Sequence, residues 1–393
     1  MKTHTAASLF FSLMILLALS ACKDSKKVEV SLSAEDFSRQ TYMIELPAGE
    51  ILERLGSPAF YVVDEKGTEI PSQLTYDSLI IFRTPLADVK TLNFKILPSD
   101  SLHTYKPLTG GDFYPKRRDD LAYENELGGY RIYGPGTREA GEKSFGYDLF
   151  FKYPDEELIL PSLYEAQTSS EPWSRVDSLR RIDPKLAKEF EDSFSYHIDH
   201  GKGMDSYAVG ATLGAGVPAL LGEEIIYPWV YETSEILDNG PLRFTYTLNF
   251  PEVELADGRK VREHRLTSLD ASSFLNKSKV WYEGLEGKNE VVTGFPLRDE
   301  TEPVYRTDKG ILLYSAPAQD PKYGRALLGL VVENPVDSFM FKDNHALLAV
   351  GLEPGDTLSY SWGFSWDKEE ISNVDEWLQY LSRFSQKPLL RLR

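Results

Sequence analysis

The sequence predicts a mainly antiparallel β protein, built as a sandwich or a barrel and decorated by a few helices. From residue 225 to residue 366 the chain is a series of short alternating segments, with turn signals every eight to twelve residues. Helical patterns are confined to residues 162–194 and the C-terminus, so no parallel α/β sheet is expected. The 393 residues are 41% hydrophobic, which is enough for a sizeable core.

The chain begins with signs of export. Lys2 precedes an apolar run too short to span a bilayer, and the run ends in Leu19-Ser-Ala-Cys22. This pattern resembles a bacterial lipobox, so we expect a signal peptide over residues 1–21, lipidation of Cys22 and a polar tether over 22–27. Cys22 is the only cysteine, which excludes internal disulfides. We therefore expect a lipid-anchored protein of the cell envelope, at the outer membrane, facing the periplasm or the surface.

Residues 28–100 are predicted to be an N-terminal β segment. Alternating runs occur at Val28–Ser33, Tyr61–Asp64, Leu79–Phe82 and Leu92–Leu97. They are either a separate small module or the first strands of the larger sandwich, and residues 99–108 are the best linker candidate. Residues 110–393 then form the main β body, with a helical insertion at about 162–194.

Local sequence signals predict where three helices begin. Asp183-Pro184 supplies an N-cap and an N1 proline, and Ser174–Asp177 resembles a capping box. At the C-terminus Ser372 is the expected cap. Behind it, five apolar residues recur at helical spacing and predict one buried stripe: Val374, Trp377, Leu378, Leu381 and Phe384.

Charge and motifs exclude several classes of partner. The net charge of −18 argues against nucleic acid and against broad attraction to anionic lipid. Gly214–Ala219 formally fits a dinucleotide pattern, but Pro218 stands where the helix should run, so no nucleotide is expected. His197, Asp199 and His200 cannot all converge from a regular strand. No metal or other cofactor is predicted.

The alternating run from Tyr360 to Trp366 places all its aromatic residues on one face. Such a face is either a platform on which sugars stack or a core strand buried against the opposing sheet. We favour the core, because aromatic side chains contribute most of the buried area in such cores.

The stretch from Tyr196 to Gly216 combines the densest polar side chains with five glycines. Two short strands are predicted, Tyr196–His200 and Asp205–Val209, joined by a Gly-Lys-Gly turn. Alternation would place His197 and Asp199 on one face, and Asp205 and Tyr207 on one face. If the turn pairs the strands, these four groups could meet. The simpler interpretation is a hairpin with a satisfied polar edge.

A second polar stretch runs from Arg118 to Tyr133, where charges alternate with aromatic residues. It is either a solvated loop or the lining of a cleft. A Tyr or His base beside an Arg that faces a carboxylate would suit proton abstraction from a uronic acid followed by β-elimination. The residues of the right type are Tyr207, Tyr133, His197, Arg131 and Arg243.

Several motifs, taken in order, resemble a family of exported bacterial proteins called domain of unknown function 4861. The motifs are Arg118–Asn125, Tyr130–Pro135, Tyr196-His197, Gly201–Gly216 and Asn239–Arg243. The resemblance implies a galactose-mutarotase-like β supersandwich. It also implies a setting among genes for polysaccharide breakdown, often of glycans that contain uronic acids.

Together these observations predict a protein that acts on an oligosaccharide or polysaccharide as a lyase or hydrolase. The expected catalytic residues are His197, Tyr207 and Asp205. The expected substrate-binding residues are Glu124, Asn125, Arg131, Tyr133 and Arg243. The alternatives are a lipoprotein that binds glycan without cleaving it, with Trp362, Trp366 or Tyr207 stacking on sugars, and a structural partner in an envelope complex.

Overall fold

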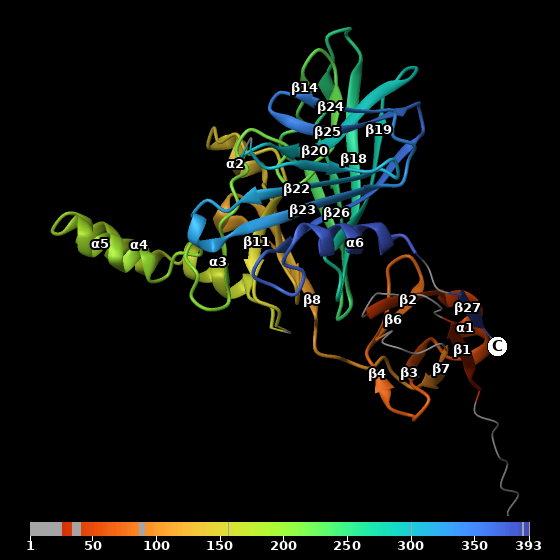
Figure 1. Cartoon of the computed structure of the whole chain (residues 1–393). Helices are drawn as coiled ribbons and strands as arrows, with labels where there is room; N and C mark the ends of the chain where they lie inside the picture. Colours follow the sequence, from red (N-terminus) through yellow and green to blue (C-terminus); the bar gives the residue numbers. More distant parts are fainter. Residues whose placement is uncertain are drawn as a thin grey trace, which may run out of the picture.

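The computed structural model describes residues 26–33, 41–85, 91–155, 157–299, 301–386 and 389–392. The predicted signal peptide, residues 1–21, and the predicted lipidation site Cys22 lie outside the described residues, as does the tether up to residue 25. The described chain is an antiparallel β supersandwich with a few decorating helices and a C-terminal helix, as predicted (Figure 1).

The main body packs one large sheet against two smaller ones. The nine-stranded sheet has the order β15-β16-β18-β19-β26-β23-β22-β21, with β17 paired to β18. Facing it are the β8–β12 sheet, in the order β12-β11-β10-β9-β8, and a second five-stranded sheet, in the order β14-β13-β20-β25-β24. One core cluster joins all three sheets, through Tyr123 of β9, Trp362 of β26 and Phe295 of β20.

The strands of the main body have the following bounds: β8 Thr109–Tyr114, β9 Asp120–Asn125, β10 Gly129–Ile132, β11 Asp148–Lys152, β12 Gly203–Asp205, β13 Ala219–Leu221, β14 Ile225–Ile226, β15 Thr233–Asn239, β16 Arg243–Asn249, β17 Val253–Glu254, β18 Lys260–Asp270, β19 Leu275–Glu283, β20 Asn289–Pro296, β21 Val304–Arg306, β22 Ile311–Pro317, β23 Arg325–Val332, β24 Ser338–Lys342, β25 His345–Leu352 and β26 Thr357–Trp366.

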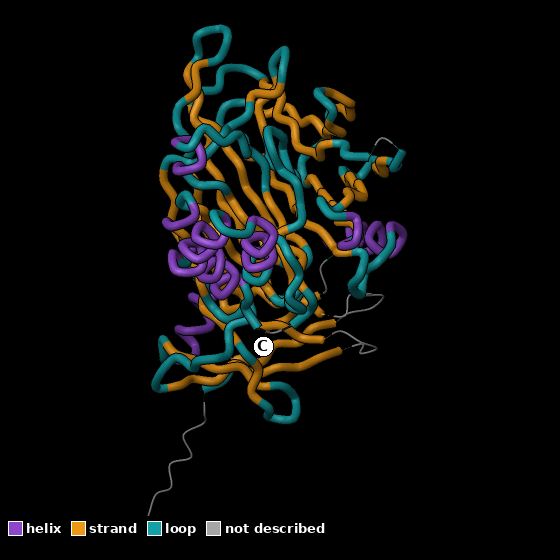
Figure 2. The backbone as a smooth tube through the Cα atoms, turned by 90° about the vertical axis from the view of Figure 1, so that its left-hand side faces the viewer, coloured by secondary structure: helices purple, strands orange, loops and turns teal. Residues whose placement is uncertain are grey.

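The N-terminal residues form a module with a core of its own. Its strands are β1 Val28–Ser33, β2 Thr41–Pro47, β3 Ala59–Val63, β4 Glu69–Ile70, β5 Ser72–Leu74, β6 Leu79–Pro85 and β7 Thr91–Ser99, with helix α1 Ala48–Leu55. The sheets β27-β1-β7-β3-β4 and β2-β6-β5 enclose a separate apolar cluster that includes Val30, Ile51 and Phe82. The module lies below the main body in Figure 1 and Figure 2.

One strand of the module comes from the far end of the chain. Strand β27, Leu389–Leu392, pairs antiparallel with β1, so that Leu392 lies opposite Val30. Leu390 packs against the apolar cluster of the module. The C-terminus thus completes a sheet that the N-terminus begins, which alternation in residues 28–100 did not reveal.

The helices decorate the outside of the sandwich. They are α2 Pro135–Glu139, α3 Leu160–Thr168, α4 Ser170–Arg180, α5 Pro184–Asp192 and α6 Val374–Phe384, with the 3₁₀ turns Pro115–Arg117 and Pro321–Tyr323. Helices α4 and α5 project away from the body (Figure 1). Helix α6 lies on β22 and β23, where Trp377 and Leu381 are buried, as its apolar stripe predicts.

One of the three predicted caps is confirmed and two are wrong. The carboxylate of Asp183 accepts hydrogen bonds from the backbone of Lys185 and Leu186. Helix α4 already begins at Ser170, so Ser174 lies inside it and its hydroxyl donates to the carbonyl of Ser170. Helix α6 is capped by Asn373, one residue after the predicted Ser372.

The aromatic residues of β26 are core, as favoured. Tyr360, Trp362, Phe364 and Trp366 are all at most 2% exposed. Trp362 stacks on Tyr147 with ring centroids 3.8 Å apart, and its Nε1 donates to Ser278 Oγ at 2.9 Å. Trp362 and Trp366 therefore cannot serve as a surface on which sugars stack.

Candidate functional site

The candidate site lies on the outer face of the β8–β12 sheet. Along β9, Leu121 and Tyr123 point into the sandwich core, so Asp120 and Glu124 point to the other side. The same alternation brings Arg131 of β10, Asp148 and Lys152 of β11 and Asp205 of β12 to this outer face. Leu160 and Tyr164 of α3 cover part of it, together with Tyr196. Charged groups are therefore buried between the sheet and its cover.

Arg131 is the centre of this polar layer. Its Nε donates to Asp148 Oδ2 at 2.8 Å, and its Nη2 to Asp205 Oδ2 at 2.8 Å. Nη1 donates to the hydroxyl of Tyr196 at 3.0 Å, and the hydroxyl of Tyr133 donates to Asp148 at 2.7 Å. Arg131 and Tyr133, both predicted to bind substrate, are thus brought together with the predicted catalytic Asp205.

These bonds leave Arg131 no capacity for a substrate carboxylate. The residue is 3% exposed, and its guanidinium already faces two carboxylates. Burial would lower the pKa of Arg131, but Asp148 and Asp205 outweigh it and raise that pKa far above its ordinary value. Burial raises the pKa of Asp148 to about 6, with Arg131 opposing and Asp205 adding to the shift. Arg131 holds three strands of the site in place.

His197 is the predicted catalytic residue that reaches solvent. Its side chain is 50% exposed, and its Nδ1 lies 3.1 Å from the carbonyl oxygen of Asp205 and 3.5 Å from Asp205 Oδ2. Because a carbonyl oxygen only accepts, Nδ1 carries the proton and the neutral ring keeps its lone pair on Nε2. This is the arrangement that orients an imidazole to accept a proton.

The predicted hairpin around His197 is wrong in its details. Tyr196–His200 forms turns, and β12 is Gly203–Asp205, which pairs with β11. One backbone bond still joins the two segments, from Asp205 N to Tyr196 O at 2.8 Å. The reason for the turn is local: Asp199 Oδ1 accepts the backbone N–H of Gly201, whose φ is +92°. His197 and Asp205 therefore meet without a regular ladder.

Tyr207 lies apart from His197. It is 2% exposed within the main core, and its hydroxyl is buried without a hydrogen-bond partner among the described residues. Burial raises the pKa of the Tyr207 phenol. The chain leaves β12 after Asp205, so the alternation that would have placed both residues on one face does not continue. Tyr207 therefore does not share a face with Asp205, and its hydroxyl is enclosed in the core.

Glu124 and Asn125 have structural partners. Glu124 Oε2 accepts from Lys152 Nζ at 2.8 Å, and Oε1 accepts from the backbone of Leu160 at 2.6 Å, at the start of α3. Burial raises the pKa of Glu124, with Lys152 opposing the shift. The side-chain amide of Asn125 donates to the carbonyls of Asp270 and Ser273 on the core side. Of these two residues, Glu124 also lines the cavity described below, and Asn125 does not.

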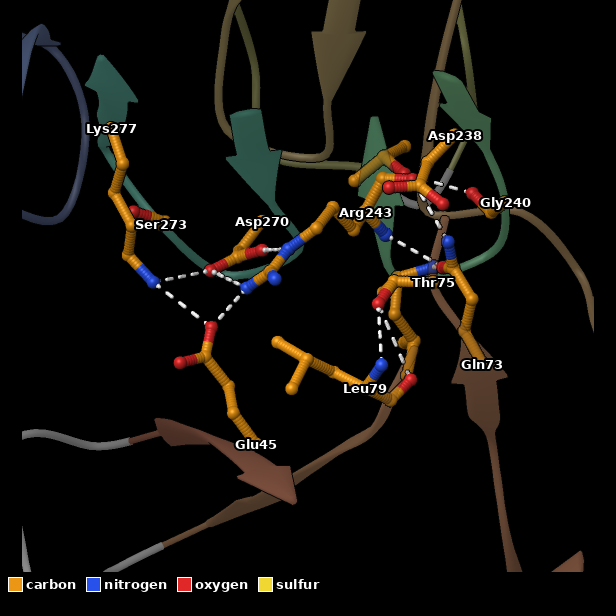
Figure 3. A network of polar contacts seen from close by, with 12 residues as sticks. Glu45, Gln73, Thr75, Leu79, Asp238, Gly240, Arg243, Asp270, Ser273 and Lys277 are labelled. Carbon is orange, nitrogen blue, oxygen red and sulfur yellow. Dashed lines mark hydrogen bonds and ion pairs between the residues drawn. The ribbon is translucent and has the colours of Figure 1, made fainter. Parts of the chain in front are cut away.

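Arg243 belongs to a different place, the junction between module and main body (Figure 3). Its Nη2 donates to Asp270 Oδ2 at 3.0 Å, and it also pairs with Glu45 of β2. Lys277 lies 3.0 Å from the same Asp270 oxygen. Gln73 of β5 accepts the backbone N–H groups of Leu242 and Arg243. Arg243, predicted to bind substrate, therefore lies at the junction, where its charge attaches the module.

A cavity of about 500 Å³ opens at the β8 edge of the sheet. It lies between β8 and α3, and Tyr114, Tyr164, Leu158, Asp112 and Glu165 are among its lining residues. Of the predicted site residues, Glu124 lines it, whereas Arg131, His197, Asp205, Tyr207 and Arg243 do not. One concave pocket therefore does not collect the predicted residues.

Sequence reasoning missed Asp148, Lys152 and the role of Tyr196. Asp148 and Lys152 stand at the two ends of Asp148–Lys152, a run whose burial is complete despite both charges. They share the face opposite to Leu149 and Phe151, and two charges on one face of an otherwise apolar run are the signal that could have located a polar outer face. Within the described residues no cluster of His, Cys, Asp and Glu is arranged to hold a metal ion. In the same residues, every helix is too short or too polar to cross a bilayer.

Comparison with known proteins agrees with the motifs. A curated relative, "Uncharacterized protein P7" of Formosa agariphila, is 25% identical over 282 residues, which are 70% of this chain and 66% of that relative. The chain thus spans slightly less than two thirds of the relative's length.

Two solved structures from Enterococcus faecalis resemble the chain at 8% and 9% identity. One is described as a protein in glycosyl hydrolase family 38 (TM-score 0.46, 93% of this chain and 47% of that chain). The other is an alpha-mannosidase (TM-score 0.45, 94% of this chain and 46% of that chain). The chain therefore spans about half the length of each.

A family model described as "Domain of unknown function (DUF4861)" matches residues 33–389. The match covers both the N-terminal module and the main body, including every motif from Arg118 to Arg243. This chain belongs to the DUF4861 family.

Proposed function

We propose that the protein is a lipid-anchored envelope protein that acts on an oligosaccharide, with His197 accepting a proton in the reaction. One observation carries the proposal. The imidazole is half exposed, while its Nδ1 is held by the Asp205 carbonyl, which leaves Nε2 as the proton acceptor. The geometry resembles that of general bases, which are oriented by a group bound to the second ring nitrogen.

Asp205 is a positioning residue in this proposal. Its carbonyl fixes the tautomer of His197, and its Oδ2, 3.5 Å from Nδ1, would stabilise the imidazolium that forms. Arg131 in turn fixes Oδ2 at 2.8 Å. The other oxygen, Oδ1, is buried without a partner among the described residues, so Arg131 is the main restraint on the carboxylate.

Two reactions fit a proton acceptor at this position. In a lyase, Nε2 takes the proton from the carbon beside the sugar carboxylate. The electron pair forms a C=C bond, the C–O bond to the leaving sugar breaks, and the leaving oxygen takes a proton from solvent water. In a hydrolase, Nε2 takes a proton from water as the water oxygen bonds the anomeric carbon, and the glycosidic oxygen leaves with a proton supplied by solvent.

The resemblance to the family suggests a glycan that contains uronic acids. Because Arg131 and Arg243 are committed to internal ion pairs, the carboxylate of such a substrate has to be held by other groups.

Purified protein incubated with uronic and neutral polysaccharides tests the activity. New reducing ends, with ultraviolet absorbance for a lyase or without it for a hydrolase, are expected. His197→Ala should lower the rate at least about 100-fold. His200→Ala is the matched control, because His200 contacts the carbonyl of Ser195 and not Asp205. Absence of any product, or full activity in His197→Ala, would contradict the proposal.

The membrane anchor is tested separately. Cys22→Ser removes the thiol that the signal sequence predicts to be lipidated. We expect the variant to leave the membrane fraction, while the parent chain remains in it. Equal membrane retention of both chains would show that Cys22 is not the anchor.

A lipoprotein that binds glycan without cleaving it is the second candidate. The cavity of about 500 Å³ favours it, since small-molecule sites have volumes of this size. It predicts saccharide binding without turnover, unchanged in His197→Ala.

A further inference from the structure

We propose that the cavity between β8 and α3 is a binding site for a neutral saccharide unit, separate from His197. The choice of a saccharide rests on the proposed function. The inference adds where on the molecule the sugar binds and that this sugar is uncharged. The cavity volume of about 500 Å³ lies within the range of sites that enclose small ligands.

The floor of the cavity is aromatic and apolar. The rings of Tyr114 and Tyr164 stack with centroids 3.8 Å apart and an interplanar angle of 26°. Tyr164 is fully buried and donates to Asp120 at 3.4 Å, so it fixes the partly exposed Tyr114. Leu158, which is partly exposed, extends this surface. The C–H face of a sugar ring packs well on such a rigid aromatic floor.

The rim supplies both donors and acceptors. Asp112, Lys116, Glu165, Thr168 and Asn239 all line the cavity. Asp112 and Glu165 are exposed carboxylates, and Lys116 is an exposed ammonium. A neutral sugar presents hydroxyls that both donate and accept around an apolar ring, which matches this mixture of groups.

The charge of the rim disfavours an anionic sugar. The carboxylate of Glu124 is neutralised by Lys152. The other charged groups that line the cavity are two carboxylates, Asp112 and Glu165, and one ammonium group, Lys116. A uronate carboxylate would therefore meet a net negative rim in a chain that already carries a charge of −18. The cavity selects for neutral units, in contrast to the uronic glycans expected from the resemblance.

The backbone of β8 keeps the cavity open. A Cβ added to Gly110 would lie 2.7 Å from Leu158 Cδ1, so the side chain of Leu158 would have to shift. The N–H of the neighbouring Gly111 donates to Asn239 Oδ1, and Asn239 Nδ2 donates back to the carbonyl of Gly111 at 2.9 Å. The edge strand is thus fixed to β15, while Gly110 adds no side chain to its outer face.

The cavity and His197 lie at opposite edges of one sheet. Strand β8 is one edge and β12, with Asp205 beside His197, is the other. Four strand spacings of about 4.8 Å separate the edges by about 19 Å. The two places are connected through Tyr196, whose ring centroid lies 5.9 Å from that of Tyr164 and 4.6 Å from that of His197. The test therefore substitutes Tyr114 and Glu165 and leaves Tyr164 unchanged.

The test measures binding by saturation-transfer NMR and calorimetry. The probes are mannotriose, galactotriose and cellotriose as neutral sugars, and trigalacturonate as the charged counterpart. We expect at least one neutral trisaccharide to bind at least about tenfold more tightly than trigalacturonate. Glu165→Trp, which fills the cavity from an exposed position, and Tyr114→Ala should each weaken binding about tenfold or more. Glu189→Trp, the same change on the exposed face of α5, is the matched control.

His197→Ala separates this inference from the proposed function. We expect it to bind the neutral sugar as the parent does, even if all turnover is lost. The inference is overturned if no neutral trisaccharide binds, if trigalacturonate binds equally well, or if Glu165→Trp and Tyr114→Ala both bind normally. Binding that depends on the cavity without any turnover would support the inference while refuting the proposed reaction.

Discussion

Arg131 and Asp205 form an ion pair at 2.8 Å in which only 4% and 1% of the two side chains are exposed. The pair joins β10 to β12 across the intervening β11, whose Asp148 binds the same guanidinium. It also sets the position of the backbone that holds His197. A charge layer of this kind stabilises a geometry, because each member would be costly to bury alone.

Arg131→Met tests how much this charge layer contributes to the stability of the fold. The change leaves Asp148 and Asp205 buried without their cation, so we expect a loss of about 3–5 kcal/mol in the free energy of unfolding. Urea denaturation at neutral pH measures it. Arg180→Met, in an exposed ion pair with Asp177, should change stability by less than about 1 kcal/mol. A loss below about 1 kcal/mol for Arg131→Met would show that the pair is dispensable.

Asp120 should make stability depend on pH between about 4 and 6. Burial raises its pKa to about 6, with Arg131 and Arg117 opposing the shift. Because the folded pKa exceeds the unfolded value, the stabilisation is complete below about pH 4 and is lost as the pH rises through 6. Asp120→Asn should thus become more stable relative to the parent over this range, by up to about 3 kcal/mol.

Urea denaturation across this pH range checks the prediction. Asp119→Asn is the control, because Asp119 is exposed and has a φ of +60°, which asparagine tolerates. Its difference from the parent should stay flat. A flat profile for Asp120→Asn as well would contradict the raised pKa.

Asp270, at the junction between the module and the main body, should make the protein less stable as the pH falls. Burial alone would raise its pKa, but Arg243 and Lys277 outweigh burial and hold the pKa well below its usual range. Its stabilisation is therefore present above about pH 4 and is lost as the pH falls below that value. We expect Asp270→Asn to be less stable than the parent by about 3 kcal/mol at pH 7 and to approach it near pH 2.

Acid titration followed by circular dichroism checks this behaviour. Asp100→Asn, at an exposed position after β7, is the control variant. If the difference between Asp270→Asn and the parent stayed constant from pH 7 to pH 2, the ion pairs of Figure 3 would not be the source of acid sensitivity.

The C-terminal strand offers a matched pair of substitutions. Leu390 packs on the core of the module, whereas Leu389 is 56% exposed. We expect Leu390→Asp to lower the free energy of unfolding by about 1–3 kcal/mol, and Leu389→Asp to change it by less than about 0.5 kcal/mol. Thermal denaturation of both variants measures the two stability losses. Equal effects would mean that β27 contributes little beyond its backbone bonds.

Much of the fold could be predicted because alternating apolar and polar residues indicate strands. The aromatic face of β26 and the stripe of α6 are periodic, and each was correctly assigned to the core. Strand β27 could not be foreseen, because Leu389–Leu392 is short and its partner β1 lies at the other end of the chain. Tyr196–His200 failed as a strand because Asp199 and Gly201 close a local turn instead.

The site was harder, because residue type does not tell what a charge is paired with. The contact of His197 with Asp205 follows from a close turn and could be anticipated. Arg243 could not be placed, since its partners Glu45 and Asp270 are distant in sequence and meet it only across the junction. The cavity beside Tyr114 is formed by β8 and α3, and neither segment carries a recognisable motif.

The pairing of β27 with β1 has a consequence for biosynthesis. The N-terminal module emerges from the ribosome early, yet the strand that pairs with β1 is made only after the whole main body. Until Leu389–Leu392 arrives, β1 presents an open row of backbone donors and acceptors, which other chains can pair with. The module therefore cannot complete this sheet until the main body has been made.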